Sequence, residues 1–251
     1  MEVHAHTHRG KKKWTEYFWE FLMLFLAVFC GFLAEYKLEH TIEHQREEKY
    51  MSSMIEDLKA DIEMLKKNIV LRKSRLLMID SLVAIINSPD RDKYGNDIYF
   101  FARSISPPAN IFPNDGTIQQ LKSSGNLRLI RNNKITNSIM AYDQKMRSVL
   151  FEMGDEIEIR SEYRQLARKI FRTNVFHEMI ATDTVSRPVN NPQLYSNDAG
   201  LINEFLGQVQ YVKRVHQAQL IKSEDLLVKA KQLIADVKHE YHMSEGTSSE
   251  K

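Results

Sequence analysis

The feature that most constrains this chain is an apolar run near its N-terminus. Residues 21–34 read FLMLFLAVFCGFLA, fourteen positions without a charge in a chain that is 27% charged. As a helix this run rises about 21 Å, which is shorter than a hydrocarbon core of about 30 Å, whereas residues 17–36 rise about 30 Å. The sequence therefore predicts a transmembrane helix at residues 17–36.

Both ends of this span carry residues suited to a membrane interface. Trp14, Tyr17 and Trp19 stand at one end and Tyr36 at the other, and such rings concentrate at the level of the lipid headgroups. Glu20 lies about one turn from the end, where its carboxylate can reach the headgroups. We expect these five residues to lie at the membrane interface.

Two other interpretations of the apolar run are a cleaved signal peptide and a buried core helix. A signal peptide needs small residues before its cleavage site, but Ala27, Val28 and Phe29 precede Cys30 and no A-x-A sequence follows. A core helix does not normally carry aromatic residues at both ends and a basic run beside it. A membrane anchor is the favoured interpretation.

The orientation of the span follows from its flanks. Arg9, Lys11, Lys12 and Lys13 precede it, whereas the residues after it mix acidic and basic side chains. The positive side of a span stays in the cytoplasm. We therefore predict a protein of the inner (cytoplasmic) membrane, with a basic cytoplasmic leader at residues 1–16 and an extracytoplasmic, or periplasmic, helical domain at residues 37–242.

After the span, the chain has the periodicity of long helices. It contains only 9 Gly and 6 Pro, and apolar side chains recur every three or four residues. We expect an all-α fold in which the transmembrane helix continues into a long helix and then into an antiparallel helical bundle or coiled coil. The expected segments are a helix at 37–88, a loop with short helices at 89–132, a helix at 133–172, a loop at 173–200, a helix at 201–241 and a disordered tail at 243–251.

Particular residues support these segments. In the first long helix the buried stripe is expected to be Met51, Ile55, Leu58, Ile62, Leu65, Ile69, Leu76, Ile79, Val83 and Ile86, with a charge at Arg72 in the same series. Asp97 is expected to cap a short helix that packs through Ile98, Phe101 and Ile105. Gly125 is expected to end another in the left-handed conformation. In the helix at 133–172, the apolar side is expected to include Ile157.

Two histidine patterns suggest metal chemistry. His40, Glu43 and His44 fit H-x-x-E-H, in which two histidines one helical turn apart share a zinc ion. The favoured alternative is a solvated helix face beside the membrane. His4, His6 and His8 alternate in the leader as a flexible chelate would, but a disordered basic tail explains them equally well. We predict no metal site and no cofactor.

Other chemical motifs are absent from the sequence. The phosphate-binding, hydrolase, dinucleotide and thiol signatures do not occur, so we do not expect an enzyme. With a net charge of +2, the chain has no basic field that would bind nucleic acid. The charged run that includes Arg160, Glu162, Arg164, Arg168 and Lys169 is expected to be a solvated helix face.

Three segments carry a resemblance to a known group of proteins. The basic head with a span that ends in GFLAEY at 31–36, SMIEDLKADI at 53–62 and LKSSGNLRLIRN at 121–132 together resemble an uncharacterised single-pass, membrane-anchored family of Bacteroidota. The resemblance covers most of the chain. Because that family has no assigned biochemical activity, the resemblance implies location and architecture only.

These features favour a scaffold or interaction protein of the cell envelope, an accessory subunit of a membrane complex. Its expected partners are the lipid bilayer, another envelope protein and, through leftover apolar stripes, further copies of itself. The alternative is an extracytoplasmic ligand-sensing bundle, since small molecules bind between helices. A leader of about sixteen residues holds no signalling domain, so such a sensor would act through a partner.

Overall fold

The structure is a computed structural model that describes residues 13–180 and 184–243. Most of the predicted leader, with His4, His6 and His8, and residues 244–251 of the predicted tail lie outside the described residues. The described part is helical and contains no strand, apart from an isolated antiparallel bridge between Ile180 and Val185. The all-α prediction is confirmed.

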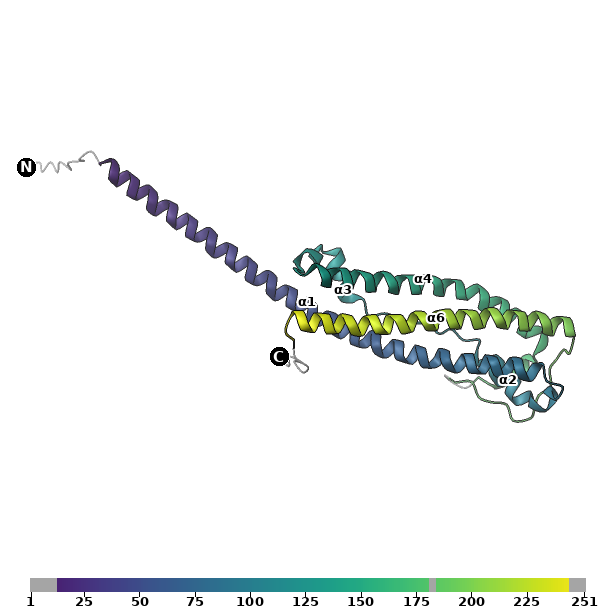
Figure 1. Ribbon diagram of the computed structural model, residues 1–251. Helices are drawn as coiled ribbons and strands as arrows, with labels where there is room; N and C mark the ends of the chain where they lie inside the picture. Colours follow the sequence, from purple (N-terminus) through teal and green to yellow (C-terminus); the bar gives the residue numbers. More distant parts are fainter. Residues whose placement is uncertain (1–12, 181–183, 244–251) are drawn as a thin grey trace, which may run out of the picture. The chain divides into compact units, whose positions relative to one another are not determined.

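Three long helices and several short ones follow one another along the chain (Figure 1). The long helices are α1 (Trp14–Ile86), α4 (Asn133–Ile170) and α6 (Ala199–Glu240). The short elements are the 3-10 turn η1 (Arg91–Tyr94), α2 (Gly95–Ser104), α3 (Gly116–Ser123), the 3-10 turn η2 (Asn126–Leu129) and α5 (Thr173–Glu178). Helix α1 therefore includes both the predicted span and the predicted long helix, without a break between them.

The chain forms two compact units, Met1–Tyr50 and Met51–Lys251. In the described part of the first unit, α1 is a bare helix whose apolar side chains are exposed. The second unit is a bundle built from residues 51–86 of α1 together with α4 and α6.

Helices α1 and α4 of the bundle run in the same direction. Asp61, early in this part of α1, accepts a hydrogen bond from Tyr142 Oη of α4 at 2.7 Å. Arg72, later in α1, contacts Glu156, which is later in α4, at 3.2 Å. Positions that increase together along both helices require parallel axes. The predicted antiparallel arrangement therefore does not hold for this pair.

Helix α6 runs antiparallel to both of the others, as Figure 1 shows. Asp80 of α1 pairs with Lys213 at 2.5 Å, whereas the earlier Lys73 pairs with the later Glu224 at 2.7 Å. Against α4, Lys145 likewise pairs with Asp225 at 3.0 Å. The prediction of an antiparallel bundle is thus confirmed for α6.

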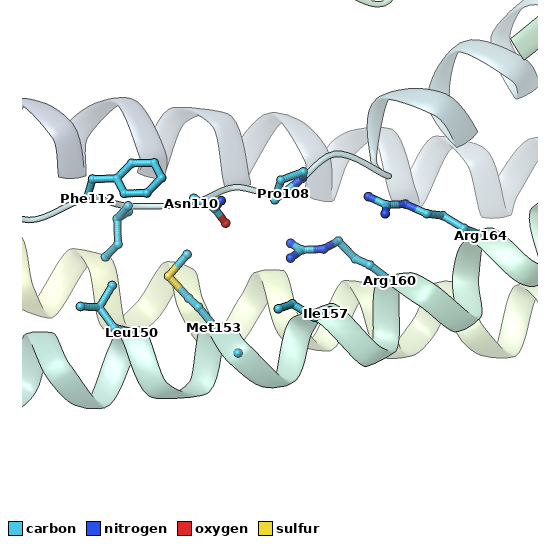
Figure 2. A pocket seen from close by; sticks show the side chains of 10 residues that line it. Pro108, Asn110, Phe112, Leu150, Met153, Ile157, Arg160 and Arg164 are labelled. Carbon is cyan, nitrogen blue, oxygen red and sulfur yellow. The ribbon is translucent and has the colours of Figure 1, made fainter. Parts of the chain in front are cut away.

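Parallel α1 and α4 require the chain to return to the start of the bundle between them. Residues 105–115, called the strap here, make this return without forming a helix or a strand. Ala109 and Ile111 of the strap are buried, whereas Pro108, Asn110 and Phe112 are exposed, so burial over 108–112 alternates as in a strand. The strap contacts α1 on one side and α4 on the other (Figure 2).

The predicted buried stripe of α1 is largely confirmed. Met51, Leu58, Leu65 and Ile79 are almost fully buried, and Ile55, Ile69 and Ile86 are buried as well. On α4, in contrast, Ile157 is exposed, because its side of the helix faces a pocket beside the strap and not the core.

Helices α2 and α5 close an aromatic cluster at the end of the bundle where α1 and α4 end and α6 begins. Tyr99 packs edge-on against Phe171 with ring centroids 5.0 Å apart, and Phe171 also contacts Phe176 and Phe205. Ile98 and Ile105 are buried as expected and Phe101 is half-buried, but the largest contribution of α2 is Tyr99, which the apolar pattern did not single out.

Two local predictions near this end are wrong. Asp97 does not cap α2, which begins at Gly95 after Tyr94; its carboxylate pairs with Arg187. The expected loop at 173–200 contains the short helix α5, which buries Val175. Both differences depend on contacts between α2 and the chain after α4, which no local pattern encodes.

The helix-end signals were more reliable. Gly125 has φ 67°, the left-handed conformation expected of it, and separates α3 from η2. Asn132 and Asp198 cap α4 and α6 by accepting hydrogen bonds from the backbone N–H groups of Lys134 and Leu201.

Candidate functional site

The first candidate site is the exposed apolar half of α1. This helix is long and apolar enough to cross a membrane, and none of its most apolar window is buried. A buried core helix would have been covered by the rest of the chain, so that alternative does not describe this segment. Phe21, Phe25 and Phe29 stack along one side of the helix, with centroids 6.2 and 5.9 Å apart.

The predicted interface residues lie on the exposed surface of this helix. Trp14, Tyr17 and Trp19 are exposed near its start, together with Glu20, and Tyr36 is exposed about five turns later. The ring of Tyr36 contacts that of His40 edge-on at 4.5 Å.

The H-x-x-E-H motif does not gather further ligands. His40 lies against Tyr36, and His44 contacts Glu47 at 3.5 Å and Glu48 at 3.4 Å on the same helix. Over residues 13–180 and 184–243, no group of three or more His, Cys, Asp or Glu side chains is arranged to hold a metal ion. His4, His6 and His8 lie outside these ranges.

The second candidate site is inside the bundle, where α1 carries a row of polar residues beside its apolar stripe. These residues hold the backbone of the strap, which has no sheet partner and must find its hydrogen bonds elsewhere. Asp57 and Asp61 accept from the N–H groups of Thr117 and Asn114 at 3.0 and 2.7 Å. Further along α1, Asn68, Arg72 and Arg75 donate to strap carbonyl groups.

Arg72 is the centre of this buried row. Its side chain is 1% exposed, and it donates to Asn68 Oδ1, to Ala109 O, to Glu156 Oε1 and to His216 Nδ1 at distances of 2.9, 3.1, 3.2 and 3.3 Å. One guanidinium group thus joins α1, the strap, α4 and α6. The charge that interrupts the apolar series is the hydrogen-bonding centre of the bundle.

His216 is a neutral acceptor in this cluster. An arginine has only donors, so Nδ1 of His216 must accept and its proton must be on Nε2. Burial, together with the positive charges of Arg72 and Arg75, lowers the pKa of His216 to about 3. The imidazole therefore adds no charge at neutral pH.

The cluster has more positive than negative charge among the described side chains. Glu156 accepts from Arg72 at 3.2 Å and from Arg160 at 2.9 Å, while the third cation, Arg75, donates to Pro107 O at 2.8 Å. Burial, with the neighbouring Arg72 and Arg160, lowers the pKa of Arg75 to about 10, which leaves it charged at neutral pH. Among the residues that the structure describes, its buried Nε has no hydrogen-bond partner.

A pocket opens beside this cluster, between the strap and α4 (Figure 2). Its volume is about 440 Å³. The lining residues are Pro108, Asn110, Ile111 and Phe112 of the strap and Leu150, Met153, Gly154, Ile157, Arg160 and Arg164 of α4. Figure 2 shows Arg160 and Arg164 toward one end and Phe112 and Leu150 toward the other. The pocket is thus cationic at one end and apolar at the other.

The prediction that the charged run on α4 is a solvated helix face is wrong for Arg160. Glu162, Arg168 and Lys169 are exposed as expected, but the Arg160 side chain is only 11% exposed because it is bonded to the buried Glu156. Arg164 is exposed, yet it donates to the hydroxyl and carbonyl oxygens of Ser106 on the strap. A signal for this site existed in the sequence: Asp57, Asp61, Asn68, Arg72 and Arg75 recur at helical spacing beside the apolar stripe.

Comparisons with known proteins return no family: no family model, no curated protein and no solved structure matches this chain.

Proposed function

We propose that this protein is a membrane-anchored scaffold of the cell envelope, which holds its helical bundle outside the cytoplasmic membrane and docks a partner protein there. The observation that carries the proposal is the bare apolar half of α1, continuous in one helix with the bundle. Exposure of so many large apolar side chains in water is unfavourable, and a bilayer removes it. The basic residues before the span favour a cytoplasmic N-terminus.

A second feature supports docking. Val70 and Leu77 of α1 and Ile221 and Val228 of α6, together called the apolar face, are 67%, 69%, 63% and 65% exposed. Each pair is seven residues apart and therefore lies on one side of its helix. The Lys73–Glu224 ion pair falls between the two residues of each pair in sequence, so all four lie at one level of the bundle.

The surface around these residues is suited to a helical partner. An apolar groove of about 500 Å³ runs along α1 there, lined by Lys66, Lys67, Val70, Leu71 and Ser74. A repeat of seven residues matches the seam of a coiled coil, in which an added helix packs its own apolar stripe. The partner that fits is an amphipathic helix of another envelope protein; a second copy of this chain would use the same face.

Orientation is tested with two C-terminal fusions. An enzyme reporter that is active only after export should be active, and a fluorescent protein that matures only in the cytoplasm should be dark. The opposite result would overturn the orientation while leaving the anchor intact.

Docking is tested by photo-crosslinking in native membranes. A photoreactive residue at Val70 or Ile221 should give a discrete crosslinked product, whereas one at Gln144, exposed on α4, should not. The double variant Leu77→Glu with Val228→Glu should abolish the product. A product that forms equally well from Gln144 would contradict docking at the apolar face, and a product of twice the chain mass would identify a self-association surface.

The ligand-sensing alternative is favoured by a different observation, the pocket between the strap and α4.

A further inference from the structure

We propose that the pocket between the strap and α4 binds a small amphipathic carboxylate, with its anionic head at Arg160 and Arg164 and its apolar body against Leu150, Met153 and Phe112. This site is separate from the apolar face, and neither proposal depends on the other.

The first argument is charge. In the described part of the bundle, Arg72, Arg75 and Arg160 share a single buried carboxylate, that of Glu156. Uncompensated charge in the interior is strongly unfavourable, so such a cluster is stabilised by an additional anion. The pocket is where an anion has access, because Arg160 is both a member of the cluster and part of the pocket wall.

The second argument is the free donor capacity at the cationic end. Of its nitrogens, Arg160 uses Nη1 toward Glu156, and Arg164 uses Nε and Nη2 toward Ser106. A guanidinium has five N–H donors in a fixed plane, so both groups retain donors for a ligand. Two guanidinium groups near one another are suited to the two oxygens of a carboxylate.

The third argument is the apolar end and its shape. Leu150 and Met153 of α4 and Phe112 of the strap provide an apolar surface, and Phe112 is 77% exposed in the absence of anything packed on it. The volume of about 440 Å³ lies in the range of small-molecule sites, about 300–1,000 Å³. A simple inorganic anion would leave this surface uncovered.

The fourth argument is Gly154. A glycine inside a helix costs about 1 kcal/mol relative to alanine, and α4 carries this one in mid-helix, in the pocket wall. A Cβ added at Gly154 would meet no atom within 4 Å, so packing of the protein itself does not require glycine here. A side chain introduced at Gly154 would therefore have room to extend into the pocket.

The test uses the full chain in lipid nanodiscs and isothermal titration with 4-phenylbutyrate, an aromatic carboxylate; its neutral amide, 4-phenylbutanamide; and inorganic sulfate. Empty nanodiscs correct for partition into lipid. We expect the acid to bind and the amide to bind at least about tenfold more weakly, because a charge-assisted hydrogen bond contributes about tenfold in affinity. Sulfate should also bind more weakly than the acid, because it has no apolar body to cover Leu150, Met153 and Phe112.

Variants locate the binding. Gly154→Phe fills the pocket without removing a charge and should abolish binding. Arg160→Gln should weaken it about tenfold, while Arg168→Gln, exposed on the same helix, should leave it unchanged. Thermal unfolding of each variant checks the fold, and Gly154→Phe decides the outcome if Arg160→Gln unfolds. Absence of binding to the wild type, equal affinity for acid and amide, or unchanged binding to a folded Gly154→Phe variant would overturn the proposal.

Discussion

The two halves of α1 use the same secondary structure with opposite patterns of polarity. Residues 17–36 carry exposed apolar side chains, and residues 51–86 bury charged and polar ones, Asp61, Arg72 and Arg75 among them. An apolar surface is stable in lipid, whereas buried charge is stable only where other groups of the protein solvate it. An α-helix can therefore carry either pattern, with apolar side chains exposed or with polar side chains buried. Residues 51–86 match the protein groups that surround them, and residues 17–36 have the length and composition of a helix that could cross a membrane.

The largest expected effect comes from removing the side chain of Arg72, the centre of the buried hydrogen bonds of residues 51–86. Arg72→Met should lower the free energy of unfolding by about 3–5 kcal/mol, because Glu156, His216 and Ala109 O lose their donor in the interior. Adding Glu156→Gln to Arg72→Met should lower the stability further, because Arg75 and Arg160 then lose the carboxylate that compensates their charge. Urea unfolding of the purified protein measures both, and a double variant more stable than Arg72→Met would contradict the account.

For the exposed half of α1, residues 17–36, the test is a charge introduced in the middle of the segment. Leu26→Arg should cost about 2.5–3.5 kcal/mol of membrane insertion and move the protein out of the carbonate-resistant membrane fraction. Leu71→Arg makes the same exchange at an exposed position of the bundle half and should leave the protein in the membrane. Equal behaviour of the two variants would show that residues 17–36 are not the anchor.

Two carboxylates in residues 51–86 of α1, one buried and one exposed, test how much burial contributes to stability. Asp61 is buried and accepts from Asn114 N and Tyr142 Oη, so Asp61→Ala should cost about 1–3 kcal/mol by leaving those donors unpaired. Asp80 is exposed and pairs with Lys213, so Asp80→Ala should cost less than about 1 kcal/mol. Urea unfolding compares them, and a larger loss for Asp80→Ala would refute the role assigned to burial.

The last expected effect is the pH dependence due to His216, which is small near neutral pH and grows in acid. Its pKa is about 3 in the folded protein against 6.5 in the reference state, so the unfolded chain binds more protons in acid. The contribution to stability is complete above pH 6.5 and declines as the pH falls toward 3, by about 1.4 kcal/mol per pH unit. His216→Asn keeps an acceptor near Nδ1 and does not titrate. Its stability should fall less than that of the wild type between pH 6.5 and 5, and parallel curves would contradict the assignment.

Much of the fold was predictable because it depends on local chemistry. The apolar stripe of α1, the left-handed Gly125 and the extents of α4 and α6 all follow from spacing or from a single residue type. The parallel order of α1 and α4 was missed, because it depends on where the strap runs. That path is set by hydrogen bonds between residues 32 to 60 positions apart, such as Arg75 to Pro107 and Thr117 to Asp57.

The candidate sites divide in the same way. The exposed apolar half of α1, which is long and apolar enough to cross a membrane, and its aromatic residues could be identified from hydropathy alone. Arg160 could not be placed correctly, because its position inside the bundle depends on Glu156 and Arg72, and no periodicity shows which charged residue of a helix has such partners. The helical spacing of the row from Asp57 to Arg75 was visible in the sequence. Its role was not, because it depends on the strap, whose backbone groups have no sheet partner.

The strap also has a consequence for the order in which the bundle assembles. Its residues contact α1 through their backbone and α4 through Ser106, so we expect α4 to take its final position only after the strap has been laid on α1. Helix α6 is expected to join last, through pairs such as Asp80 with Lys213, which are 133 residues apart. This sequence of steps follows the direction of synthesis, in which N-terminal segments emerge first. A chain that is made from its N-terminus to its C-terminus can therefore add each layer onto one already in place.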